Sequence, residues 1–163
     1  MLEKAGEPHY NMIFNISFAT RDDIPQLAEI ERSCFSFPHT EEQIFHELTD
    51  SVHYYLIAKS GEELVGYVSV AKIIDEVYIG NVAVKEVFRR EGVGDTLINA
   101  LIYQCREDNC SFITLEVRND NYPAINLYKK HGFSITGIIK DYYSSPKDDA
   151  VIMTIDIKKD RLF

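Results

Sequence analysis

A glycine-containing turn between a strand-like run and a helix-like run constrains the fold of this chain most strongly. Residues 89–94 read Arg-Arg-Glu-Gly-Val-Gly, after the apolar run 78–84 and before the amphipathic run 93–105. Glycines let backbone N–H groups crowd around an anion, and a helix N-terminus adds a favourable dipole. Arginines donate charge-assisted hydrogen bonds to phosphate oxygens. The segment predicts a strand–loop–helix unit that binds a pyrophosphate, although a turn that merely contains glycines would look the same.

The turn differs from two other phosphate-binding loops. A P-loop requires Gly-Lys followed by Ser or Thr, and no such triplet follows here. A dinucleotide fingerprint requires a third glycine where this chain has Leu97. The predicted anion site therefore belongs to neither of these classes.

Composition indicates one globular domain without a metal. A chain of 163 residues with 45% hydrophobic and 26% charged residues is ordinary for a soluble protein, and it should bury roughly 70% of its unfolded surface. No apolar run approaches the roughly 18 residues of a membrane span, and no signal-peptide pattern begins the chain. Cys34, Cys105 and Cys110 lack metal-ligand spacing, and the histidines form no HxH or HExxH pattern. We expect reduced thiols, a cytoplasmic location and no membrane partner.

The charge balance narrows the range of partners. A net charge of −9 and a pI near 5.0 argue against non-specific binding to nucleic acid. They are compatible with a basic protein or an amine as substrate. The paired arginines at the turn stand out against this acidic background, as a local anion site would.

The order of predicted elements defines the fold class. Residues 1–14 look like a peripheral extension, and residues 15–160 like one domain. Thr40 and Gln43 form a capping box before the second helix. The predicted elements are a strand at 16–19, a helix capped by Asp22 or Asp23 and ending near Cys34, a helix at 41–48, strands at 54–58, 64–74 and 76–84, a helix from 93, a strand at 112–117, a helix at 123–130 ended by Gly132, and strands at 133–139 and 151–157 around a polar loop at 144–149. This order predicts a single mixed α/β domain with about six to seven strands, about four helices, an antiparallel front and a parallel centre.

Glu116 is the first candidate for chemistry, because it interrupts an otherwise apolar strand. Strands alternate faces, so its side chain can simply point to solvent. Alternatively, it is a carboxylate at the interior edge of the sheet, where desolvation suits it to general-base work. The sequence leaves both interpretations open.

Asn121 and Tyr128 are the next candidates. Seven positions separate them, so on one helix they lie within roughly 20° of the same face. The helix can thus present an amide near its start and a phenol near its far end to one ligand. The alternative is that Tyr128 is a core aromatic residue with a bonded hydroxyl.

These motifs together resemble the GNAT family of N-acetyltransferases. The Arg-x-x-Gly-x-Gly loop after a strand resembles the family's pyrophosphate loop for coenzyme A, and the element order is the same. Glu116-Val117-Arg118 and the segment Asn121 to Phe133 look like the bacterial ribosomal-protein-alanine N-acetyltransferases of this family. Residues 34–38, Cys-Phe-Ser-Phe-Pro, and residues 141–143, Asp-Tyr-Tyr, resemble that subfamily too. The resemblance covers about residues 16–157.

The resemblance implies a role for each matching residue. Glu116 matches the general base that takes a proton from the amine, and Tyr128 matches the general acid that protonates the departing thiolate. Asn121 matches a side-chain contact to the cofactor. The residues that match the pantetheine-pairing strand edge are Val82, Ala83 and Val84. Those that match the pyrophosphate loop are Arg89, Arg90, Glu91, Gly92, Val93, Gly94 and Asp95. Those on the acceptor side are Phe37, His39, Tyr142 and Tyr143.

Acid–base chemistry is compatible with these implied roles. An α-amine has a pKa of about 8 and a lysine about 10.4, so a carboxylate deprotonates the α-amine more readily. A phenol with a pKa of about 10 can protonate or stabilise a thiolate of about 8.5. Strand-edge amides would stabilise the tetrahedral oxyanion. Because the amine attacks the thioester directly, Cys105 and Cys110 are interpreted as structural.

Two positions depart from the subfamily pattern. His39 stands where tryptophan is usual. This departure leaves the preference for a peptide acceptor open, but it does not affect the expectation of acetyl transfer. The simpler interpretation is that His39 is a surface histidine at the start of a helix. Arg89 replaces a common glutamine at the first loop position.

The resulting hypothesis is an acetyl-CoA-dependent enzyme that acetylates a protein N-terminal α-amine, in particular the alanine N-terminus of small-subunit ribosomal protein eighteen. One rival is a GNAT enzyme acting on a small amine or a lysine side chain. The other is a non-catalytic acyl-CoA-binding module, against which Glu116 and Tyr128 argue, because a binder needs no matched base and acid.

Overall fold

A computed structural model describes residues 14–158 of the chain. The extension predicted at residues 1–14 lies, except for Phe14, outside the described residues, as do residues 159–160 of the predicted domain. The described part contains four α-helices and one seven-stranded mixed sheet, as the sequence predicts.

The element boundaries follow the sequence pattern closely. In chain order the elements are β1 (Asn15–Phe18), α1 (Ile24–Cys34), α2 (Glu41–Thr49), β2 (His53–Ser60), β3 (Glu63–Ile73), β4 (Glu76–Val84), α3 (Val93–Glu107), β5 (Phe112–Arg118), α4 (Tyr122–Lys130), β6 (Ser134–Ser144) and β7 (Lys147–Asp156). Short 3₁₀ turns precede α1 and follow β4.

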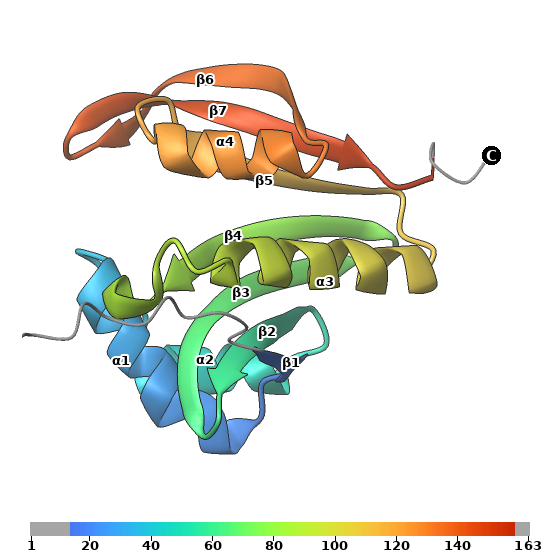
Figure 1. Ribbon diagram of the computed structural model, residues 1–163. Helices are drawn as coiled ribbons and strands as arrows, with labels where there is room; N and C mark the ends of the chain where they lie inside the picture. Colours follow the sequence, from blue (N-terminus) through green and yellow to red (C-terminus); the bar gives the residue numbers. More distant parts are fainter. Residues whose placement is uncertain (1–13, 159–163) are drawn as a thin grey trace, which may run out of the picture.

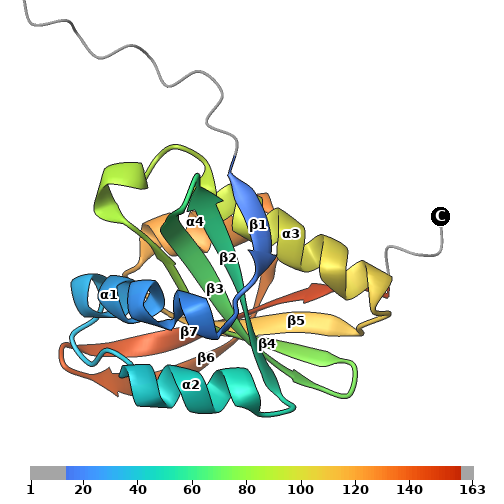
Figure 2. The same cartoon turned by 90° about the horizontal axis from the view of Figure 1, so that it is seen from below.

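The sheet has the strand order β1-β2-β3-β4-β5-β7-β6, in which β4 and β5 are parallel and the other neighbouring pairs antiparallel. Helices α3 and α4 cover one face (Figure 1). Helices α1 and α2 cover the opposite face, but only over β2, β3 and β4 (Figure 2). The half built from β5, β7 and β6 therefore has one face that no helix of the described chain covers.

Two apolar clusters hold the helices to the sheet. The larger one lies beneath α3 and α4 and includes Leu97, Leu101, Ile113 and Met153, each fully buried. The smaller one lies beneath α1 and α2 and is centred on Leu27, Ile30, Ile44, Tyr55 and Tyr67. Burying side chains of this size stabilises the fold by about 1.5–3 kcal/mol each.

A β-bulge in β4 separates the two halves of the sheet. Val68 pairs with Val82 and Val70 with Ile79, so Ser69 alone lies opposite both Gly80 and Asn81. The Ser69 hydroxyl accepts a hydrogen bond of 2.8 Å from the Asn81 N–H. A bulge bends its strand and increases the local twist. The pairing of β4 with β5 accordingly covers only residues 76–78 of β4, after which the strands diverge (Figure 1).

The helix starts agree with the sequence, with one correction. The predicted Thr40–Gln43 capping box is present at the start of α2. Asp23 is the N-cap residue of α1, as the sequence predicts, but its side chain makes no capping hydrogen bond to this helix. Instead the Asp23 carboxylate accepts the Thr20 N–H at 2.8 Å and forms an ion pair with Lys59, which ties the 3₁₀ turn before α1 to β2.

The predicted polar loop at 144–149 is wrong. Strands β6 and β7 extend into this region and leave a turn at Ser145–Pro146. Polar residues tolerate the extended conformation here because their groups have partners: Asp149 Oδ1 accepts the Asp141 N–H and Asp148 Oδ2 accepts the Asp120 N–H. In the described residues, no helix is long and apolar enough to cross a membrane.

An ion-pair cluster joins α4 to α3. Asp95 Oδ1, in the first turn of α3, lies 2.8 Å from His131 Nε2 and 3.0 Å from Lys130 Nζ, at the end of α4. Burial alone would raise the pKa of Asp95, but these two partners hold it below its ordinary value of 3.8. The carboxylate therefore stabilises the fold when charged.

We expect Asp95→Asn to lower the free energy of unfolding by about 0.5–1 kcal/mol at pH 7, the scale of a partly exposed ion pair. Because the folded-state pKa is depressed, this contribution is complete well above pH 3.8 and disappears as the pH falls through the folded pKa. Urea unfolding of both proteins at neutral and acidic pH measures the difference, with Asp22→Asn as an exposed control. A difference independent of pH would contradict the ion-pair account.

Candidate active site

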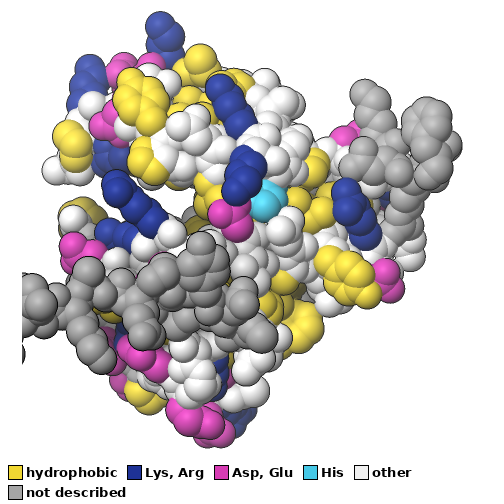
Figure 3. Space-filling model, in the orientation of Figure 1, with side chains coloured by type: hydrophobic (Ala, Val, Ile, Leu, Met, Phe, Trp, Pro, Cys, Tyr) yellow, Lys and Arg dark blue, Asp and Glu magenta, His cyan; other side chains and the backbone are white. Residues whose placement is uncertain are grey.

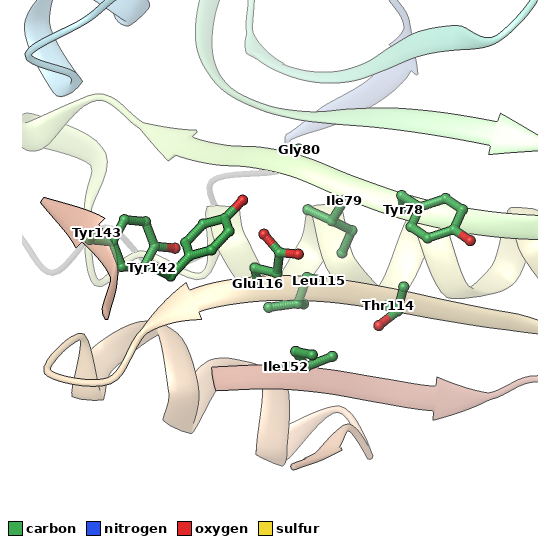
Figure 4. Close-up of a pocket in the computed structure, with 9 residues that line it drawn as sticks. All are labelled: Tyr78, Ile79, Gly80, Thr114, Leu115, Glu116, Tyr142, Tyr143 and Ile152. Carbon is green, nitrogen blue, oxygen red and sulfur yellow. The ribbon is translucent and has the colours of Figure 1, made fainter. Parts of the chain in front are cut away.

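A cavity of about 540 Å³ opens where β4 and β5 diverge. Ile79 points into it from β4 and Glu116 from β5, while the Tyr78 ring extends along β4 away from Glu116 (Figure 4). The β6–β7 hairpin supplies two aromatic walls. The lining residues are Tyr78, Ile79, Gly80, Thr114, Leu115, Glu116, Tyr142, Tyr143 and Ile152.

Glu116 lies on the face of β5 that no helix covers, and its side chain is exposed within the cavity rather than buried. Its neighbours Leu115 and Val117 are buried in the core, as strand alternation requires. The Tyr142 hydroxyl points toward the Glu116 carboxylate (Figure 4), whose accepting oxygens and negative charge raise the pKa of the Tyr142 phenol. The structure thus places the candidate base and a candidate acceptor-side residue in contact.

Arg118 holds the hairpin that carries Tyr142 and Tyr143. Its guanidinium donates to the carbonyl oxygens of Pro146 at 2.8 Å and Ser145 at 3.2 Å. The guanidinium carbon also lies 4.3 Å from the centre of the Tyr143 ring, within the range of a cation–π contact. Three contacts therefore fix the aromatic wall relative to the strand that carries Glu116.

Tyr128 is buried on α4, with its ring 5.5 Å from that of Phe133. Burial raises the pKa of this phenol above its ordinary value of 10. Among the hydrogen bonds of residues 14–158, none involves its hydroxyl group. The residue is thus both a core aromatic and a phenol that keeps its proton at neutral pH.

The edge of β4 that faces β5 has no strand partner beyond Tyr78 within residues 14–158. Val82, Ala83 and Val84 lie in this stretch and pair only with β3 on their other side. An unpaired strand edge offers backbone N–H and C=O groups to a ligand. This geometry is suited to an extended chain containing amides.

The loop before α3 has the geometry of an anion site. Gly92 precedes the helix with φ of +84°, and Arg90 also has a positive φ of +64°. The first helical hydrogen bond runs from the Thr96 N–H to the Gly92 carbonyl, so the N–H groups of the first turn before Thr96 have no partner along the helix. Lys and Arg side chains border the hollow between the two halves of the molecule on this face (Figure 3).

Other predicted cofactor-binding side chains have protein partners. Arg89 donates from Nε to the Val84 carbonyl at 3.1 Å and lies 3.7 Å from the Cys34 sulfur. Asp95 is engaged by α4, as described above. Asn121 caps α4 by accepting the Ala124 N–H at 3.3 Å. These side chains shape the loops around the site in this structure.

The residues predicted for the acceptor side lie in different places in the structure. Tyr142 and Tyr143 line the cavity beside Glu116. His39 instead lines a neighbouring cavity beneath α2, and its backbone N–H donates to buried Glu31 at 2.9 Å. Phe37 is 88% exposed and lines neither cavity.

Several lining residues were not predicted from the sequence. Tyr78 lies between the two cavities and donates from its hydroxyl to Glu76 at 2.7 Å. Gly80, an isolated glycine in a strand pattern, is the signal that could have indicated the bulge. Thr114 and Ile152 line the floor but have no distinguishing sequence feature. Within residues 14–158, no three His, Cys, Asp or Glu side chains are grouped to hold a metal ion.

The divergent parallel strands, the glycine-containing turn before α3 and the carboxylate in the cavity are the features expected of an α/β acyltransferase. The chain belongs to the acetyltransferase (GNAT) family, whose profile matches residues 24–133. The resemblance inferred from the sequence is therefore confirmed, and the protein is an acetyltransferase.

Relatives narrow the position within the family. A Bacillus subtilis protein, provisionally named a [ribosomal protein bS18]-alanine N-acetyltransferase, is 38% identical over 140 residues, covering 85% of this chain and 92% of the relative. The crystal structure of the Escherichia coli ribosomal-protein-S18-alanine N-acetyltransferase superposes with a TM-score of 0.82 at 26% identity, covering 89% of this chain and 94% of the other. Arabidopsis thaliana NAA60 in complex with acetyl-CoA shares the fold, with a TM-score of 0.76 at 22% identity, covering 87% and 99% of the two chains.

Replacing Arg118 with lysine should raise the KM for the acceptor about threefold to thirtyfold, on the scale of one or two ordinary hydrogen bonds. A lysine cannot form both carbonyl bonds and the ring contact, so the wall bearing Tyr143 loses its fixed position. The KM for the acyl donor should not change. Steady-state kinetics with each substrate varied separately distinguishes the two effects.

Lys147→Gln is the matched control for this prediction. It removes a cation from the same hairpin, where Lys147 forms an exposed ion pair with Asp141 at 3.4 Å. Equal changes in both KM values for Arg118→Lys would indicate general loosening and contradict the positioning role.

Proposed function

We propose that this acetyltransferase transfers the acetyl group of acetyl-CoA to a protein N-terminal α-amine, with the alanine N-terminus of ribosomal protein bS18 as the acceptor and the cytoplasm as its location. The proposal rests mainly on the position of Glu116. This residue lines the cavity that opens where β4 and β5 diverge. The names of the Bacillus subtilis and Escherichia coli relatives support this choice of acceptor.

The donor would bind across the gap between the two strands. In this proposal the pantetheine arm pairs with the free edge of β4 at Val82 to Val84, and the pyrophosphate accepts N–H donors from the first turn of α3. The segment that would surround it consists of Arg90, Glu91 and Gly92 of the loop and of Val93 and Gly94, the first residues of α3. The acetyl thioester would then reach the bulge at Gly80, beside Glu116.

The amine enters from the face that no helix covers. Glu116 would accept its proton, either directly or through a water molecule, while Tyr142 and Tyr143 hold the acceptor backbone. The nitrogen lone pair attacks the thioester carbonyl, and a backbone N–H of β4 stabilises the oxyanion. The nitrogen of the tetrahedral intermediate then loses its second proton to solvent. When the C–S bond breaks, Tyr128 donates its proton to the thiolate and is reprotonated by solvent, so free CoA and the amide are the products.

An α-amine suits this site better than a lysine side chain. The pKa of an α-amine is about 8 and that of lysine about 10.4, so the neutral nucleophile is more than a hundredfold more abundant for the α-amine near neutral pH. An exposed carboxylate is a modest base. It therefore needs the more acidic of the two ammonium groups.

The acceptor class can be tested by CoA release in the presence of acetyl-CoA. The panel contains a peptide copying the bS18 N-terminus, the same peptide with a blocked α-amine, a blocked peptide with an internal lysine, and spermidine. We expect activity with the free α-amine and at least tenfold less with the others. Activity with spermidine or lysine alone would overturn the acceptor proposal. Donor binding without transfer to any acceptor would favour a non-catalytic module.

We expect Tyr128→Phe to lower kcat about tenfold to a thousandfold, the contribution of a general acid. The ring and its contact with Phe133 are retained, so the melting temperature should change little. Tyr122→Phe, on the same helix but 68% exposed, is the matched control and should retain full activity. Near-normal single-turnover chemistry in Tyr128→Phe would exclude the proton-donor role.

A further inference from the structure

A second cavity of about 340 Å³ lies beneath α2 and adjoins the catalytic one. The two cavities share Tyr78, Ile79 and Gly80, so they are neighbours on either side of the same short stretch of β4. The other lining residues of this α2-side cavity are His39, Glu47, His53, Ser69, Val70, Ala71 and Asn81.

Gly80 keeps the boundary between the cavities free of a side chain. A Cβ atom placed there would lie 2.8 Å from Ser69 Oγ, closer than such atoms normally approach. Ser69 Oγ is in turn fixed by the Asn81 N–H of the bulge. The absence of a side chain at Gly80 therefore lets Ser69 pack against the bulge where the two cavities adjoin.

Glu47 is the charged group of the α2-side cavity, since neither Lys nor Arg is among its lining residues. Within residues 14–158, its carboxylate accepts a hydrogen bond from Tyr55 and has no ion-pair partner. Burial, reinforced by this bond and by the charge of Glu47, raises the pKa of Tyr55, so the phenol remains a donor. The bond fixes the orientation of a carboxylate that lacks a counter-ion.

The two histidines that line this cavity each lie near a carboxylate. His53 Nδ1 lies 2.6 Å from Asp50 Oδ2. His39 Nδ1 lies 3.7 Å from Oε1 of Glu31, which is 2% exposed and also accepts the Tyr67 hydroxyl. The cavity thus has a carboxylate behind His39 as well as Glu47 in its own lining.

We propose that the α2-side cavity is a second acceptor subsite, in which Glu47 binds a cationic side chain from one of the first two residues of the acceptor. This inference rests on the proposed function, since it takes the acceptor to be a peptide with a free α-amine at Glu116. Paired strands are about 4.8 Å apart, so β3 lies about 5 Å from β4, whereas β5 is farther from β4 at Gly80 because the two strands have diverged there. Two extended residues span about 7 Å, and a lysine or arginine side chain extends this reach.

The subsite explains why a carboxylate without a counter-ion stands beside the reaction cavity. An ammonium or guanidinium group there forms a charge-assisted hydrogen bond with an already oriented acceptor. A half-buried bond of this kind contributes less than a fully buried one, because water screens it. We therefore expect about a tenfold preference for a cationic over a neutral side chain of similar length.

Binding to the complex of the enzyme with CoA tests the subsite without any need for turnover. Calorimetry compares Ala-Lys with Ala-Gln peptides and Lys-Ala with Gln-Ala peptides, all with free α-amines. For at least one pair, the lysine peptide should bind the wild-type protein about tenfold more tightly. Glu47→Gln, which can still accept the Tyr55 hydrogen bond, should abolish this preference. Glu42→Gln, on the same helix with its side chain 84% exposed, should retain it.

The salt dependence provides a measurement on the unaltered protein. The preference should shrink as the salt concentration rises, because ion pairs are screened. Equal affinities within both wild-type pairs, or a preference that survives Glu47→Gln, would overturn the subsite. Acetylation of the neutral peptides at the same rate would then leave the proposed function intact. A lysine preference in binding without acetylation of any peptide would instead contradict the proposed function and retain the subsite.

Discussion

The hydrogen bond between Ser69 Oγ and the Asn81 N–H is the interaction on which the site depends. It stabilises a bulge in which Ser69 alone faces Gly80 and Asn81. Because the bulge turns β4 away from β5, the only parallel pair among the described strands ends at Tyr78. The divergence creates the catalytic cavity and frees the edge of β4. A straight β4 would pair with β5 along its whole length, which would eliminate the cavity and leave no free edge of β4.

A second set of contacts builds the acceptor side around this divergence. Arg118 holds the turn between β6 and β7, and the loop before α4 is bonded to the same hairpin through Asp148. Tyr142 and Tyr143 are thereby fixed relative to Glu116 on β5. Arg118, which fixes the hairpin, lies on the same strand as Glu116. The Glu116 carboxylate and the two tyrosines therefore keep a fixed position relative to each other.

Much of the fold could be predicted from the sequence, because hydrophobic periodicity and turn residues agreed along the chain. The capping box at Thr40 and the strand–turn–helix unit around Gly92 are local signals, and local signals predict elements well. The hairpin at 144–149 was missed because its polar residues are satisfied by Arg118 and by the loop at Asp120, partners distant in the sequence. Periodicity carries no information about such partners.

The site was predictable only in part for the same reason. Strand alternation placed Glu116 on one face, but whether that face is covered depends on where α1 and α2 pack. Tyr78, Gly80 and Glu47 become neighbours only through the sheet register and the position of α2. The side chains of Arg89 and Asp95 match a loop motif, yet in the structure they bind β4 and α4. A sequence motif identifies the loop, but it does not determine which partner each side chain of the loop contacts.

Amide hydrogen exchange with and without acetyl-CoA tests the central claim most directly, namely that the free edge of β4 and the first turn of α3 receive the donor. The account predicts slower exchange on binding for the amides of residues 82–84 and 92–95. The amides of β1, at the far edge of the sheet, should not change. Protection confined to other segments, with residues 82–84 unaffected, would contradict it.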